Sequence, residues 1–218
     1  MQANYVQRLR LTFRKDGPTR FIGHLDLART LERALNRAKI PMAYTQGFNR
    51  RPRMQIAAAL PLGFTSDCEM ADIYLLETME PETAKAQMAL RMAPGIEVYQ
   101  VEEIPIRDPA LQTVTQTADY RVTLLDPVDT AVLQQRIDAF LAAESAIRER
   151  GHGRKRKSYD LRPLVKTVRL EETEPAVVLY MRLLLQHSKS GRPDELLRTL
   201  EIDPLSTRIH RTEIAFDY

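Results

Sequence analysis

The sequence contains a single cysteine, Cys68, among its 218 residues. One cysteine excludes an intrachain disulfide, a cysteine-based zinc site and an iron–sulfur cluster held by this chain alone. The four histidines are far apart in the sequence, so we expect no metal site. This cysteine usage is typical of a reducing compartment.

Long apolar stretches are also lacking. No run approaches the roughly 18 residues that a membrane-spanning helix needs. The first residues, MQANYVQRLRLTF, enter a strand-like alternation directly and contain no signal-peptide apolar region. We therefore expect a cytoplasmic protein that does not interact with membranes.

Recognisable catalytic motifs are scarce. The sequence contains no glycine-rich nucleotide loop, serine nucleophile elbow or zinc-deaminase signature. His24 and Asp26 are the catalytic candidates, because a histidine beside an acid can transfer protons near neutral pH. Both stand where a helix is predicted to begin, however, and there Asp26 would bind free backbone N–H groups. The sequence favours this structural role and a protein that is not an enzyme.

Charge is strongly segregated along the chain. Residues 14–54 contain ten basic and three acidic residues, and residues 147–169 contain nine and two. Residues 67–108 contain three basic and ten acidic residues. Two basic blocks indicate a surface for a polyanion, although charge runs are often only solvated faces.

Hydrophobic periodicity predicts a β-α-β-β-α-β order in residues 1–104. The expected strands cover residues 5–13, 54–60, 68–76 and 96–104, and the expected helices cover 24–39 and 81–92. Pro105, Pro109 and a Thr/Gln tract make residues 105–118 a predicted linker.

The same order recurs in residues 119–218. We expect strands near 120–125, 159–170, 177–186 and 207–216, helices near 129–143 and 193–200, and a basic insertion at 148–157. Two β-α-β-β-α-β units predict an α+β protein built from two tandem ferredoxin-like halves packed together.

The first helix and the loop after it form the clearest candidate binding region. Arg29, Arg33 and Arg37 recur every four residues, opposite a leucine stripe. This row is either a solvated face or a set of phosphate contacts, because arginine binds phosphate with two parallel hydrogen bonds.

The loop at residues 44–53 combines aromatic, amide and basic side chains, as single-stranded RNA binding requires. Its aromatic residues offer stacking faces, Asn49 a base-edge contact and the arginines phosphate contacts. The alternative is an ordinary connection in which Phe48 fills the core. The candidate RNA-binding residues of this loop are Tyr44, Phe48, Asn49, Arg50, Arg51 and Arg53.

A second basic segment precedes the motif Tyr-Asp-Leu-Arg-Pro at residues 159–163. Its two glycines suggest a hairpin tip that becomes ordered on a phosphate backbone, or else a solvated loop. Asp160 is expected to orient Arg162. The candidate RNA-binding residues here are Arg154, Lys155, Arg156, Lys157 and Arg162.

Several motifs together resemble the radical SAM-linked protein family. They are RFIGHLD at 20–26, ERAL at 32–35, YTQGFN at 44–49, PLG at 61–63, YDLRP at 159–163 and RTE at 211–213. That family is a domain of unknown function encoded beside, or fused behind, radical SAM proteins. The resemblance therefore implies a radical SAM partner that holds SAM and the iron–sulfur cluster, with no cofactor in this chain.

The family usually continues Gly-Phe-Asn with Pro-His-Pro-Arg, where this chain has Arg50-Arg51-Pro52-Arg53. The absence of this histidine argues against acid–base chemistry in the loop. The arginines that this chain has instead suit phosphate binding. Genes for a ribonuclease and ribosomal proteins near many members suggest RNA. We expect a tRNA or rRNA ligand and no DNA.

Three functional hypotheses follow from the sequence. The first is a non-catalytic accessory protein that presents RNA to a radical SAM modification enzyme. The second is a metal-independent endoribonuclease resembling CRISPR repeat-processing enzymes, with His24 as the general base and Arg53 stabilising the phosphorane. The third is a protein-interaction scaffold without an RNA ligand, whose acidic middle segment binds the partner.

Overall fold

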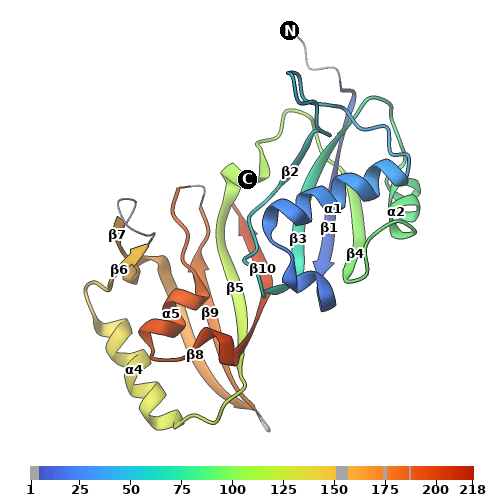
Figure 1. Ribbon diagram of the computed structural model, residues 1–218. Helices are drawn as coiled ribbons and strands as arrows, with labels where there is room; N and C mark the ends of the chain where they lie inside the picture. Colours follow the sequence, from blue (N-terminus) through green and yellow to red (C-terminus); the bar gives the residue numbers. More distant parts are fainter. Residues whose placement is uncertain (1–4, 151–156, 174–175, 187) are drawn as a thin grey trace. The chain divides into compact units, whose positions relative to one another are not determined.

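The computed structural model describes residues 5–150, 157–173, 176–186 and 188–218. The chain divides into two compact units, one formed by Met1–Thr115 with Asp217–Tyr218 and the other by Gln116–Phe216. Each unit combines a β-sheet with a few helices, so the protein is of the mixed α+β class (Figure 1). Within the described ranges, no helix has the length and apolar character needed to span a bilayer.

The first unit has the predicted element order. Its sheet has the order β4-β1-β3-β2, and each neighbouring pair is antiparallel. The elements are β1 (Gln7–Lys15), the 3-10 helix η1 (Gly17–Phe21), α1 (His24–Arg37), β2 (Met54–Ile56), β3 (Thr65–Leu75), α2 (Pro81–Ala89), β4 (Ile96–Glu103) and the short α3 (Leu111–Val114).

Both α1 and α2 pack against the same hydrophobic core on one face of this sheet (Figure 1). On α1 the buried residues include Leu27, Leu31 and Leu35, whose four-residue spacing keeps them on one side of the helix. On β1 they meet Leu9 and Leu11, which alternate with polar residues along the strand. Burying each leucine contributes about 1.5–3 kcal/mol. The opposite side of α1 is left in solvent.

Both faces of β1 are covered, although an apolar–polar alternation such as its own is typical of a half-buried strand. Arg8 and Arg10 are only 1% and 4% exposed. Both guanidinium groups donate to the carboxylate of Asp72 on β3, Arg8 from Nε at 3.1 Å and Arg10 from Nε at 2.8 Å. Arg10 lies directly opposite Asp72 in the strand register. The polar half of the β1 alternation is therefore a buried ion network.

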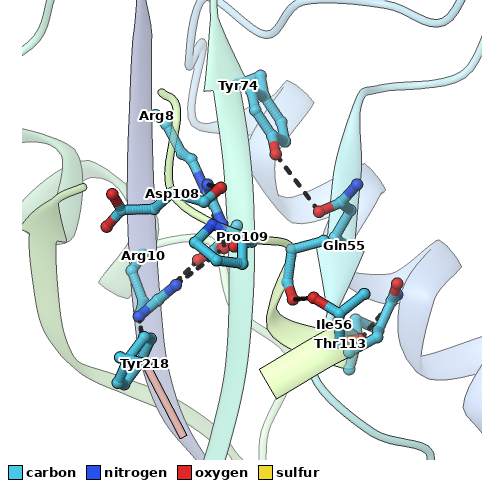
Figure 2. A network of polar contacts seen from close by, with 12 residues as sticks. Arg8, Arg10, Gln55, Ile56, Tyr74, Asp108, Pro109, Thr113 and Tyr218 are labelled. Atoms are coloured by element: carbon cyan, nitrogen blue, oxygen red, sulfur yellow. Dashed lines mark hydrogen bonds and ion pairs between the residues drawn. The ribbon is translucent and has the colours of Figure 1, made fainter. Parts of the chain in front are cut away.

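Other N–H groups of the two guanidiniums donate to residues that are far away in the sequence (Figure 2). Arg8 donates to the backbone carbonyls of Asp108 and Pro109 at 2.7 and 2.8 Å. Arg10 donates to the hydroxyl of Tyr218 at 2.6 Å. Buried charges are tolerated when such bonds replace their hydration, so the network holds the segment after β4 and the C-terminal residue against β1.

The second unit contains a sheet in the order β10-β5-β9-β8 and a separate hairpin of β6 and β7 (Figure 1). Its elements are β5 (Thr115–Leu124), α4 (Thr130–Ala142), β6 (Ile147–Arg150), β7 (Lys157–Asp160), η3 (Arg162–Leu164), β8 (Val165–Thr173), β9 (Ala176–Leu184), α5 (Pro193–Thr199), η4 (Pro204–Ser206) and β10 (Thr207–Phe216).

Several boundaries differ from those expected, and two of the differences change the element order or the linker. The strand predicted at 159–170 is divided into β7 and β8 by η3, because Pro163 cannot donate a sheet hydrogen bond and suits a helical first turn. The predicted linker at 105–118 contains α3 and the first residues of β5. Thr115 and Ala118 are buried there, which a polar Thr/Gln tract does not signal.

Helix α5 begins at a buried carboxylate. Asp194 accepts two hydrogen bonds of 2.9 Å from Arg192 and one of 3.2 Å from Arg198. Burial alone would raise the pKa of Asp194, but the hydrogen bonds from the two arginines outweigh burial and lower it. The ion cluster therefore stabilises the unit at neutral pH, and this contribution is lost as pH falls through the lowered pKa.

Replacement of Asp72 tests the importance of the buried network. Asp72→Asn would leave two buried guanidinium groups without an anion, so we expect the free energy of unfolding to fall by about 3–5 kcal/mol. The matched control is Glu97→Gln, which breaks an exposed ion pair with Arg14 (3.3 Å) and should cost at most about 0.5 kcal/mol. Urea denaturation of both variants measures the difference, and equal effects would contradict this account.

Candidate nucleic-acid interface

The loop at residues 44–53 is closed at its base by backbone contacts. The N–H of Arg53 donates to the carbonyl of Ala43 at 2.7 Å, and the N–H of Thr45 donates to the carbonyl of Arg51 at 2.8 Å. Tyr44 and Pro52 form a β-bridge between these two bonds. The ends of the loop are thus held together, and residues 46–50 form its exposed tip.

The closed loop lies beside α1 through two side-chain contacts. The hydroxyl of Tyr44 donates to Oδ1 of Asn36 at 3.2 Å, and the guanidinium of Arg51 lies 3.2 Å from the carboxylate of Glu32. Glu32 and Asn36 are four residues apart and so share one side of the helix. These contacts bring the helical arginine row and the loop onto one surface.

We call this region the arginine surface. All its members are exposed, and residues 24–53 contain seven basic and two acidic residues. The side chain of Phe48 is fully exposed, and that of Tyr44 is 44% exposed. The alternative in which Phe48 fills the core is therefore wrong. The arginine surface consists of Arg29, Arg33, Arg37, Tyr44, Phe48, Asn49, Arg50 and Arg51.

Its arginines differ in how far they are already bonded. Arg29 forms a long ion pair of 3.5 Å with Asp26, and Arg37 donates to the backbone carbonyl of Arg91 at 2.9 Å. Within the part of the chain that the structure describes, neither Arg33 nor Arg50 forms an ion pair. Those two guanidinium groups are the most available to an external anion.

Arg53 lies apart from this surface, contrary to expectation. Its guanidinium lies 4.7 Å from the ring centre of Tyr5 and 4.9 Å from that of Tyr74. Such cation–π contacts hold the side chain against the protein. Arg53 therefore anchors the base of the loop. The prediction that it contacts phosphate is not supported by this position.

Arg162 is also bound within the protein. Its Nε and Nη2 donate to the carbonyl of Leu141 at the end of α4, at 3.2 and 2.8 Å, and its Nη1 donates to the carbonyl of Val165 at 3.2 Å. Asp160 accepts the backbone N–H of Arg162 at 3.0 Å, whereas the guanidinium is held by the carbonyls of Leu141 and Val165. Lys157 is exposed on β7. The predicted contacts Arg154, Lys155 and Arg156 lie outside the described residues.

The catalytic candidates His24 and Asp26 occupy the first turn of α1. The carboxylate of Asp26 contacts Arg29, and the Nδ1 atom of His24 is buried without a hydrogen-bond partner in the described structure. The two side chains therefore lack the direct contact that a proton-transfer pair would use. The described residues also contain no cluster of three or more histidine, cysteine or acidic residues able to hold a metal.

Two residues that were not among the predicted site residues, Glu32 and Asn36, position the loop. Glu32 and Asn36 are ordinary helix residues by type, and only their shared side of α1, next to the arginine row, hinted at a contact. Without them the arginine row and the loop would be two separate basic segments.

Three solved structures are similar at low identity: a Cbf5-Nop10-Gar1 complex (TM-score 0.49, 12% identity), an archaeal box H/ACA sRNP Nop10-Cbf5 complex (0.42, 10%) and an H/ACA RNP bound to a substrate RNA containing 2'-deoxyuridine (0.44, 12%). The similarity covers 94%, 97% and 97% of this chain, respectively. It covers 48% of the other chain in each case, so this chain spans about half the length of those proteins. A search of curated proteins found no match. A family model described as "Uncharacterized protein conserved in bacteria (DUF2344)" matches residues 8–193, so the chain belongs to this family.

Proposed function

We propose that this protein is a cytoplasmic, non-catalytic accessory module that binds RNA through the arginine surface. The observation that carries the proposal is the position of the loop along α1, which combines exposed arginines with a fully exposed Phe48. Arginines bind the phosphate backbone, and an exposed aromatic ring stacks on an unpaired base. This combination favours single-stranded or looped segments of tRNA or rRNA over a regular duplex.

Three observations support a binding role over an endoribonuclease. The phosphorane-stabilising role requires the guanidinium of Arg53 to face the RNA, whereas it lies against the rings of Tyr5 and Tyr74. His24 and Asp26 have no direct contact that would couple them for proton transfer. The exposed residues of the arginine surface recognise phosphate and base faces and include no general base.

We further propose that the RNA is presented to a radical SAM enzyme, which would hold SAM and the iron–sulfur cluster. The motif resemblance supports this partner. The corresponding sheet orders of the two units, β4-β1-β3-β2 and β10-β5-β9-β8, support a tandem ferredoxin-like architecture. Copurification of the tagged protein under anaerobic conditions measures the association. Recovery of a radical SAM enzyme is the expected result, and its absence from the purified material would count against this partner.

Removing the two unpaired arginines tests the electrostatic contribution. Arg33→Ala/Arg50→Ala should weaken binding of unstructured RNA and reduce the slope of log K against log salt concentration by about 1.4, since each phosphate contact contributes about 0.7. A titration at several salt concentrations gives both values. Arg121→Ala/Arg208→Ala is the matched control, because it removes two exposed arginines from the second unit. Equal losses in both double variants would show that binding does not use the arginine surface.

Substitution of Phe48 tests base stacking separately from charge. Phe48→Ala should weaken binding of single-stranded RNA by about 1–3 kcal/mol, whereas Phe48→Tyr should retain it because the ring remains. Folding should be unaffected, since Phe48 packs against nothing in the core. Fluorescence anisotropy measures the affinities, with Leu90→Ala as a control at another exposed apolar residue of the same unit. An unchanged affinity for Phe48→Ala would exclude a stacking role.

A further inference from the structure

The second unit contains a hollow of about 330 Å³ that none of the functions discussed so far uses. It lies where the end of β5, the first turns of α4 and the segment between α5 and β10 meet. This volume is at the lower end of the range for ligand sites, about 300–1,000 Å³. A few side chains of a partner would fill it.

The floor of the hollow is apolar. Leu124 and Leu133 are buried beneath it, and the side chains of Val128, Val132 and Ile202 line it while remaining partly exposed. Apolar surface is thus continuous from the core of the unit to solvent at this point. A purely polar ligand would leave that surface hydrated, so the complex would lack the favourable free energy of removing apolar surface from water.

The rim carries carboxylates that lack a cation. Glu201 forms an ion pair with Arg136, but within the described residues Asp126, Asp129 and Asp203 form none. Asp129 and Asp203 each accept one backbone N–H, at 3.1 and 3.0 Å, which leaves their negative charge uncompensated. The lining contains the four carboxylates and one cation, Arg136, so it keeps a negative balance that attracts a cationic ligand.

We propose that this hollow binds a segment of a partner protein in which a lysine or arginine is flanked by apolar residues. The aliphatic stem of such a side chain covers the valines and Ile202, while its charged end reaches the carboxylates. Apolar neighbours in the segment would cover Leu125 and Leu205, which flank the hollow in the sequence and are 51% and 90% exposed. The carboxylates favour a cationic segment over a neutral or acidic one. The apolar floor favours a segment with apolar side chains over a simple polycation.

The proposal is independent of RNA binding. An RNA phosphate would be repelled by Asp126, Asp129 and Asp203, so the hollow and the arginine surface select ligands of opposite charge. Each proposal can therefore fail without affecting the other.

Binding of fluorescently labelled peptides to the full-length protein tests the proposal. The probes are short peptides of alternating lysine and leucine, lysine and serine, and glutamate and leucine. We expect the lysine–leucine peptide to bind, the lysine–serine peptide to bind about tenfold more weakly, and the glutamate–leucine peptide not to bind. Absence of lysine–leucine binding at low salt, or equal affinity for the lysine–serine peptide, would overturn the proposal.

Matched charge reversals locate the binding. Asp126→Arg should weaken lysine–leucine binding by about tenfold, whereas Glu144→Arg, an equal change at an exposed residue outside the hollow, should alter it by less than about twofold. Circular dichroism confirms that both variants fold. Equal losses would indicate a diffuse electrostatic effect and refute the site. Self-association of the wild type that Asp126→Arg abolishes would assign the hollow to a second copy of the chain and also refute a separate partner.

Discussion

The ion network of Arg8, Arg10 and Asp72 is the constraint on which the first unit depends. Two buried arginines share one carboxylate, and their other donors require carbonyl and hydroxyl groups from distant parts of the chain. Because an unpaired buried charge costs several kcal/mol, these segments must be in place together. The network therefore links the correct pairing of β1 with β3 to the position of the C-terminal Tyr218.

The same strand also supports the proposed RNA-binding loop. Two residues after Asp72, Tyr74 contacts Arg53 through its ring and donates its backbone N–H to the carbonyl of Arg53 at 3.2 Å. The base of the loop is thus attached to the strand that carries the buried carboxylate. A rigid base with an exposed tip reduces the ordering cost when a ligand binds.

Charge is used differently in the two units. Asp72 lies in the acidic segment at residues 67–108, yet it is buried and paired with arginine. The surface of that segment is therefore less negative than its count of acidic residues indicates. Exposed cations gather on α1 and the loop of the first unit. In the second unit, Asp126, Asp129 and Asp203 at the hollow form no ion pair within the described residues. The proposed RNA-binding surface and the proposed peptide-binding hollow therefore differ in the sign of their charge.

The sequence by itself determined the element order of the first unit, the α+β class and the basic character of α1 and its loop. These features follow from local periodicity, proline and glycine positions and charge, all of which are readable along a single segment. The starts of α1 and α2 agree with those expected, because the leucine stripe of α1 and Pro81 in the first turn of α2 are strong local signals. The short α3 and the early start of β5 carried no comparable signal.

Only the tertiary structure decided which charged residues are available. Arg53 and Arg162 look like Arg33 and Arg50 in the sequence, but packing holds the first two within the protein and leaves the other two exposed. The burial of the polar face of β1 and the acidic hollow likewise depend on segments far apart in the chain. Such properties arise from long-range contacts, which local sequence patterns do not encode.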